Sequence, residues 1–120
     1  MARSFRNLVV WQKGMELAEE VYAIVRDLPK YETYGLGDQM RRAAVSVPSN
    51  IAEGCGRGTD KDWVHFLGQA LGSLFELETQ LELSVRLGHL PPGKTEAAVA
   101  LAQEAGKMLN ALIRKYGVRN

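Results

Sequence analysis

Apolar residues recur every three or four positions through most of this chain, which is the spacing of one face of an α-helix. The pattern first predicts a helix at residues 8–28. Pro29 ends it, because the residue before a proline is disfavoured in the α region. Two adjacent stripes form the apolar face of this helix, and we expect the stripe that holds Trp11, Met15 and Tyr22 to be largely buried.

The same spacing predicts three further helices, separated by short segments rich in glycine and proline. We expect them at residues 37–55, 60–88 and 93–116. Thr59 begins a capping box with Asp62, in which the threonine side chain accepts a hydrogen bond from a free N–H of the first helical turn. The positions expected to be buried in these helices are Met40, Val47, Ile51, Leu67, Leu74, Leu81 and Leu109.

No segment alternates apolar and polar residues as a half-buried strand does. The sequence therefore predicts an all-α protein, an antiparallel up-and-down four-helix bundle that forms a single domain over residues 1–120. The composition, 46% hydrophobic and 24% charged, is that of a globular protein. No apolar run approaches the roughly 20 residues of a membrane span, and the N-terminal apolar patch is too short for a signal peptide, so we expect a cytoplasmic protein.

Candidate chemistry is sparse in this sequence. The stretch GHLPPGKT, residues 88–95, fits the phosphate-loop pattern G-x-x-x-x-G-K-[ST]. It follows a predicted helix rather than a strand, and its two prolines lack the N–H groups that would hold a phosphate, so we interpret it as a helix end and a turn. His65 and His89 have no carboxylate or thiol at metal-ligand spacing, and Cys55 has no recognisable base. These features predict a non-enzymatic protein with no cofactor or metal.

A polar line runs along the predicted second helix within the segment RRAAVSVPSNIAEG, residues 41–54. Pro48 removes a backbone N–H there, and we expect it to bend the helix so that the polar line meets a neighbouring subunit or helix. In the third helix, two glycines four residues apart each cost about 1 kcal/mol against alanine and leave a flat strip for another backbone. Ordinary packing within one chain remains open as an alternative. The predicted contact residues are Arg42, Ser46, Asn50, Glu53, Gly68 and Gly72.

The charge of the chain leaves two functions open. Fifteen basic and 14 acidic residues give a net charge of +1, less than is usual for a protein that binds nucleic acid by charge alone. A local basic surface, repeated in an oligomer, would still bind RNA or DNA. The alternative is a protein-interaction scaffold or adaptor without nucleic-acid binding. The candidate nucleic-acid residues are Arg3, Arg6, Arg41, Arg42, Arg57, Lys61, Arg114, Lys115 and Arg119.

Three segments within residues 5–90 occur in a distinctive order: VWQ, then YGLGDQMRRAAVSVPSNIAEG, then FLGQALGSLFELETQLEL. Together they resemble the family of four-helix-bundle proteins encoded by intervening sequences of bacterial 23S rRNA genes. The resemblance implies a bundle that assembles into a ring-like homopentamer. It also implies kinship with the accessory variability determinant of diversity-generating retroelements, which binds nucleic acid and a reverse transcriptase. The family supplies no catalytic residues to carry over.

Overall fold

Four long helices form the body of the protein in a computed structural model that describes residues 4–117. They are α1 (Val9–Val25), α2 (Leu36–Arg57), α3 (Asp60–Arg86) and α4 (Glu96–Gly117). Short 3-10 helices precede α1, α2 and α4, namely η1 (Phe5–Asn7), η2 (Lys30–Glu32) and η3 (Pro92–Lys94). The described residues contain no strand, which confirms the all-α four-helix bundle.

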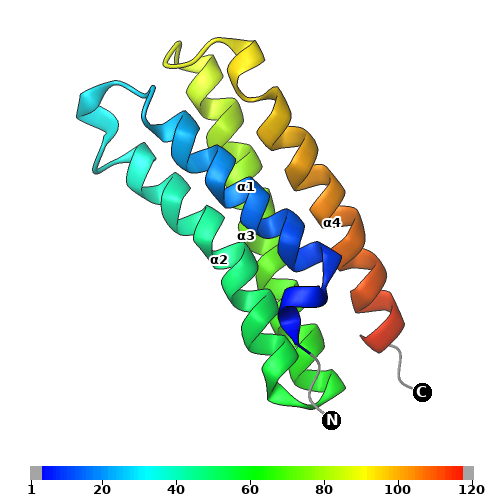
Figure 1. Ribbon diagram of the computed structural model, residues 1–120. Coiled ribbons are helices and arrows are strands. Elements are labelled where there is room, and N and C mark those ends of the chain that lie inside the picture. The colour runs from blue at the N-terminus through cyan, green and yellow to red at the C-terminus, as the bar shows by residue number, and fades with distance from the viewer. Residues whose placement is uncertain (1–3, 118–120) are drawn as a thin grey trace.

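The helices run alternately up and down along a molecule of 47 × 23 × 20 Å (Figure 1). Helix α1 packs against α2 and α4, and α3 packs against the same two helices. The connections α1–α2 and α3–α4 lie at one end, which we call the loop end (residues 26–35 and 87–95) (Figure 1). The α2–α3 connection lies at the other, the turn end (residues 58–59), near the start of α1 and the end of α4.

Helix α1 is shorter than the predicted range of 8–28. After Val25 the backbone hydrogen bonds join residues three apart rather than four. The N–H groups of Asp27 and Leu28 donate to the carbonyls of Ile24 and Val25. This tighter turn directs the Leu28 side chain into the interior, where it is 7% exposed. The prediction therefore placed the end of the helix three residues too late.

The remaining helix boundaries follow from local capping. Thr59 begins α3 and its hydroxyl accepts from the N–H of Asp62 at 3.2 Å, as predicted. Gly58 and Gly88 adopt the left-handed conformation, with φ of 90° and 76°, and end α2 and α3. Helix α4 begins at Glu96 rather than at residue 93, because η3 forms a separate turn first.

The core contains the expected residues of α2, α3 and α4, but one predicted stripe of α1 is wrong. Met15 and Tyr22 are 40% and 42% exposed, and Trp11 is only half-buried. The adjacent stripe of α1, which includes Leu17 and Val21, is fully enclosed instead. A helix with two apolar stripes directs only one of them at the bundle axis. The predicted residues that are fully buried are Met40, Val47, Ile51, Leu67, Leu74, Leu81 and Leu109.

Pro48 is buried at the contact between α1 and α2, and α2 runs through it as one helix. It faces Gly14 of α1. A Cβ atom at Gly14 would lie 3.3 Å from Val47 Cγ1 and 3.5 Å from the Cβ and Cδ of Pro48. A Cβ at this position would therefore be tight against Val47 and in ordinary van der Waals contact with the proline ring, so α1 and α2 pack closely here.

Gly54 should control the spacing of α2 and α3 at the turn end. A Cβ there would lie 2.7 Å from Phe66 Cβ and 3.0 Å from Trp63 Cε3. We therefore expect Gly54→Ala to lower the free energy of unfolding by about 1–3 kcal/mol, measured by urea denaturation. Gly56→Ala is the matched control, because nothing lies within 4 Å of its Cβ and alanine favours the helix by about 1 kcal/mol. Equal effects of the two substitutions would contradict this account.

Candidate functional site

Most of the predicted nucleic-acid residues gather at the turn end. Arg57 ends α2 and Lys61 lies in the first turn of α3, while Arg114 and Lys115 lie in the last turns of α4 (Figure 1). Arg6 belongs to η1, just before the start of α1. The fold thus brings together basic residues that are far apart in the sequence. Two further candidates lie outside the described residues, Arg3 and Arg119.

The cations of the turn end differ in their partners. Arg57 donates to Glu53 at 2.8 Å, and its guanidinium also lies 5.0 Å from the centre of the Phe66 ring. Within residues 4–117, no carboxylate lies at ion-pair distance from Lys61, Arg114 or Lys115. Nearby acidic residues of the first turn of α3 offset part of this charge. The turn end nevertheless presents lysine and arginine groups that are available to an anion.

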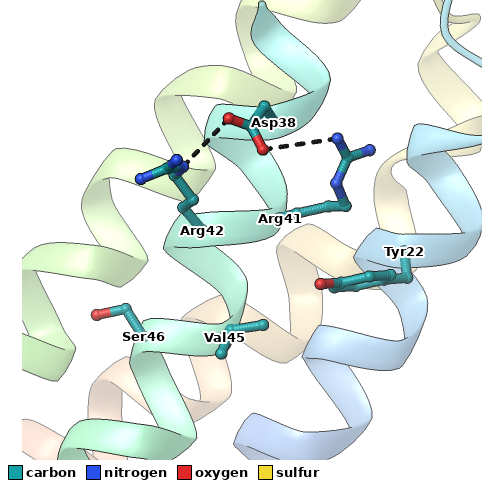
Figure 2. Close-up of a pocket in the computed structure, with 6 residues that line it drawn as sticks. All are labelled: Tyr22, Asp38, Arg41, Arg42, Val45 and Ser46. Atoms are coloured by element: carbon teal, nitrogen blue, oxygen red, sulfur yellow. Dashed lines mark hydrogen bonds and ion pairs between the residues drawn. The ribbon is translucent and has the colours of Figure 1, made fainter. Parts of the chain in front are cut away.

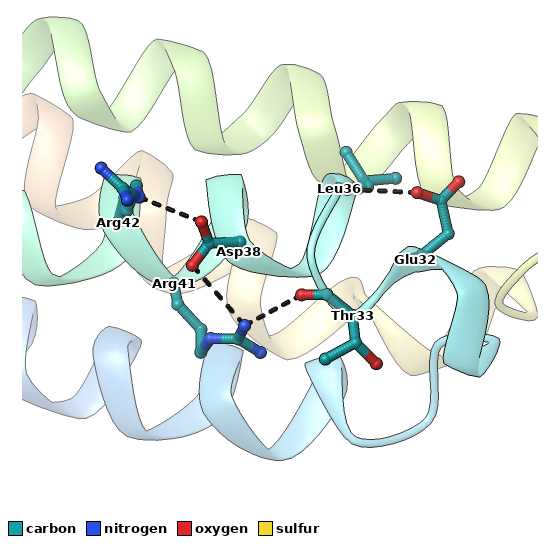
Figure 3. Close-up of polar contacts among 6 residues, drawn as sticks. All are labelled: Glu32, Thr33, Leu36, Asp38, Arg41 and Arg42. Atoms are coloured by element: carbon teal, nitrogen blue, oxygen red, sulfur yellow. Dashed lines mark hydrogen bonds and ion pairs between the residues drawn. The ribbon is translucent and has the colours of Figure 1, made fainter.

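Two other candidate residues, Arg41 and Arg42, lie near the loop end, where Asp38 contacts both of them (Figure 3). Its Oδ2 accepts from Arg42 Nε at 3.1 Å, and its Oδ1 lies 3.7 Å from Arg41 Nη2. Arg41 Nη2 also donates to the carbonyl oxygen of Thr33 at 3.0 Å. The Arg41 side chain is 25% exposed, whereas that of Arg42 is 80% exposed. One carboxylate and two guanidinium groups leave this pair with a net positive charge.

These arginines line a hollow of about 400 Å³ on the outer face of α2 (Figure 2). Tyr22 reaches from α1 toward Val45 of α2, and Ser46 lies on the far side of the same helix (Figure 2). Tyr22 and Val45 are 42% and 43% exposed and supply an apolar wall. The sequence reasoning missed this hollow because it assigned Tyr22 to the core. The sequence did contain a signal for this surface, namely the second apolar stripe of α1. A helix with one buried face needs only one such stripe.

The predicted polar line of α2 finds partners within one chain. Ser46 Oγ lies 2.7 Å from Ser73 Oγ of α3, so this residue joins two helices of the bundle. Asn50 Nδ2 donates to the carbonyl of Ser46 at 2.8 Å and lies 2.9 Å from its Oγ. Glu53 pairs with Arg57, as described above. Ser46 therefore makes a contact between two helices of the chain, whereas Asn50 and Glu53 bond within α2.

The outer face of α3 is different. Nothing lies within 4 Å of a Cβ built at Gly68 or Gly72, so packing within the described chain does not require either glycine. Further along the same face, Phe75 and Leu83 are 58% and 42% exposed. Thr79 lies between them, and its hydroxyl donates to the carbonyl of Phe75 at 2.8 Å, which leaves mainly its methyl group at the surface. We call these five residues the α3 stripe.

The residues of the phosphate-loop pattern form the connection between α3 and α4, as interpreted from the sequence. Gly88 closes α3, and residues 92–94 form η3. Lys94 Nζ pairs with Asp27 Oδ2 at 2.7 Å, and this carboxylate raises the pKa of Lys94 above its usual value. His65 is exposed and lies 3.2 Å from the side-chain nitrogen of Gln69. No group of three metal-ligating side chains occurs in the part of the chain that the structure describes.

A contact that the sequence did not predict joins the two connections of the loop end. His89 Nε2 lies 2.9 Å from Glu32 Oε2, although the residues are 57 positions apart. The other oxygen of Glu32 accepts from the N–H of Leu36 at 3.1 Å and caps the start of α2 (Figure 3). The hydrogen bond from Leu36, followed by that from His89, holds the pKa of the Glu32 carboxyl below its usual value.

Comparisons with known proteins agree with this geometry. The family profile described as 23S rRNA-intervening sequence protein matches residues 6–111. A crystal structure of a protein with unknown function from the S23 ribosomal protein family of Bacteroides thetaiotaomicron is similar, with a TM-score of 0.82 and 25% identity. The alignment covers 88% of this chain and 96% of that chain. None of the curated proteins matches. Among residues 4–117, no helix is long and apolar enough to cross a membrane.

The lowered pKa of Glu32 predicts a pH-dependent contribution to stability. A carboxyl whose pKa is lower in the folded state stabilises the protein above its unfolded pKa of about 4.3. This contribution disappears as the pH falls through the lower, folded pKa. Glu32→Gln keeps an acceptor for Leu36 but removes the charge, so the variant should be less stable at neutral pH, and the difference should shrink in acid.

Urea denaturation of wild type and Glu32→Gln across the acid range measures this difference. Glu82→Gln is the control, because Glu82 forms an exposed pair with Arg86 and such pairs contribute little. A wild-type advantage that stays constant from neutral pH to below the carboxyl pKa would contradict the prediction.

Proposed function

The chain belongs to the 23S rRNA-intervening sequence protein family, and from this premise we propose that it is a non-enzymatic, oligomeric helical bundle that binds nucleic acid, RNA above all, through a basic surface. The observation that carries the proposal is the turn end. Lys61, Arg114 and Lys115 meet there from α3 and α4 without carboxylate partners among the described residues.

Binding of this kind is driven by release of counterions from the nucleic-acid backbone. A lysine or arginine already paired with a carboxylate contributes little, since its charge is neutralised before the phosphate arrives. The net charge of +1 therefore understates the positive charge available at the turn end. Many cations elsewhere are paired, such as Arg86 with Glu82 and Lys94 with Asp27. In an oligomer, several turn ends would act on one RNA and raise the overall affinity.

The dependence of RNA affinity on salt concentration tests this proposal. Each phosphate contact contributes about 0.7 to the slope of log K against log salt for a single strand. Replacing both Arg114 and Lys115 with glutamine should therefore reduce the slope by about 1.4 and weaken binding at low salt. Fluorescence anisotropy with a labelled RNA measures the slope.

A variant with the same change of charge at the loop end is the control for this experiment. Lys30→Gln combined with Arg86→Gln should leave the slope as in wild type, because neither residue belongs to the turn end. A wild type that binds no RNA, or binds it without dependence on salt, would reject nucleic-acid binding through this surface.

We further propose that copies of the chain assemble through the α3 stripe. Its length from Gly68 to Leu83 is roughly 22 Å at 1.5 Å per residue, enough for several turns of a neighbouring helix. Each glycine costs the isolated helix about 1 kcal/mol, and close approach of a second backbone would offset that cost. Exposed Phe75 and Leu83 supply apolar area to the same contact. A homopentameric ring, which the family resemblance implies, is the expected product.

Assembly can be tested with Gly72, the second residue of the α3 stripe. We expect wild type at micromolar concentration to exceed the 13.3 kDa of one chain by a factor of five in light scattering. Gly72→Leu should dissociate the assembly, since the added side chain would fill the space needed by the neighbour. Gly56→Leu is the matched control, as Gly56 is also helical and open but lies outside the stripe. A monomeric wild type would reject the proposal.

A scaffold or adaptor without nucleic-acid binding is the second candidate function. The nearly balanced charge and the apolar α3 stripe favour it. In that case a protein partner, such as the reverse transcriptase that the resemblance implies, would occupy the stripe in place of a second copy. The salt titration separates the two candidates, because only phosphate contacts give a steep dependence on salt.

A further inference from the structure

Tyr22 is the feature of the hollow on α2 that packing within the chain does not explain. It is 42% exposed. Its ring points across the α1–α2 boundary toward Val45, which is exposed to a similar degree (Figure 2). A partly buried aromatic ring beside an aliphatic side chain offers a surface on which a planar group can stack.

The charge beside this surface suits a single anion. Asp38 binds Arg42 through Nε, which leaves the two Nη groups of that 80% exposed side chain free to bind an oxyanion. Arg41 is held in place by Asp38 and by the carbonyl of Thr33. Two guanidinium groups and one carboxylate leave a charge of about +1, which one phosphodiester group would neutralise.

The dimensions of the hollow suit a group larger than an isolated phosphate. Its volume of about 400 Å³ falls within the roughly 300–1,000 Å³ of small-ligand sites. Arg41 and Val45 are one helical turn apart, so the charged and apolar parts are offset by roughly 6 Å along α2. A ligand with an anionic group beside a flat ring matches this offset, and a nucleotide unit has that form.

We propose that this hollow binds one unpaired nucleotide of a single-stranded RNA, with the phosphate at Arg41 and Arg42 and the base against Tyr22 and Val45. The inference rests on the proposed nucleic-acid function and adds a preference for single strands. A paired base in a duplex is already stacked on its neighbours and cannot reach Tyr22. The turn end binds the phosphates of single-stranded and duplex RNA alike, whereas the hollow binds only the single strand.

Anisotropy with a labelled RNA of about 12 nucleotides, alone and annealed to its complement, tests the proposal on the full chain. Tyr22→Leu keeps an apolar contact but removes the ring. It should lower the affinity for the single strand by about 5- to 150-fold, the range of stacking on one aromatic residue, and leave the affinity for the duplex within about twofold. Tyr22→Phe retains the ring and should bind as wild type.

Matched controls are available for both parts of the hollow. Tyr34→Leu alters a 92% exposed tyrosine outside the hollow and should leave both affinities unchanged. Arg42→Gln should weaken binding of the single strand, whereas Arg86→Gln should not. Arg86 is 75% exposed and pairs with a carboxylate one turn earlier, as Arg42 does.

Photocrosslinking of wild type to an RNA that contains 5-iodouridine gives a second readout that does not depend on the stability of any variant. The crosslinked peptide should contain Tyr22. Crosslinks confined to the turn end, or a Tyr22→Leu variant that binds the single strand as wild type does, would overturn the hollow as a nucleotide site. In that outcome the proposed function would still hold if the substitution of Arg114 and Lys115 lowers the salt slope.

Two other outcomes overturn the inference in different ways. A Tyr22→Leu variant that changes the mass of the assembly but not the RNA affinity would assign the hollow to a protein contact. A wild type that binds neither RNA would reject the hollow and the proposed function together.

Discussion

Gly14 of α1 packs closely against α2, where a Cβ atom on it would lie 3.3 Å from Val47 Cγ1 and 3.5 Å from the Pro48 ring. With Gly14 directed at α2, the stripe that contains Leu17 and Val21 points to the bundle axis. The neighbouring stripe is then left at the boundary with α2, where Tyr22 projects beside Val45. The hollow on α2 thus lies where the apolar stripe of α1 that does not face the bundle axis meets the arginines of α2.

The position of Pro48 also decides what the polar residues of α2 do. The apolar ring occupies the face toward α1, so the polar line lies on another side of the helix. There Ser46 meets Ser73 of α3, and Asn50 bonds back to Ser46. Buried or half-buried polar groups need such partners, and here a single chain provides them. The α3 stripe differs, because within the described part of the chain nothing lies within 4 Å of a Cβ built at Gly68 or Gly72.

The antiparallel arrangement of the helices separates the basic residues into two surfaces with different chemistry. At the turn end, Arg114 and Lys115 are exposed cations that pair with no carboxylate among residues 4–117, and such cations suit a phosphate backbone of any sequence or form. On α2, Asp38 orients Arg41 and Arg42 beside an aromatic ring, which suits a single nucleotide unit. A chain with nearly balanced total charge thus carries two local basic surfaces that differ in their neighbouring side chains.

The sequence by itself determined the four helices, the cap at Thr59, and the faces of α2, α3 and α4 that are buried, because period and capping are properties of neighbouring residues. It did not determine which of two stripes on α1 faces the core, and so it misplaced Tyr22. That choice belongs to the tertiary structure, since it depends on how α1 packs against α2 and α4. The pairing of Glu32 with His89, and the meeting of α3 and α4 cations at the turn end, were decided in the same way. Contacts between residues so distant along the chain exist only once the helices are packed, and no local pattern encodes their distance.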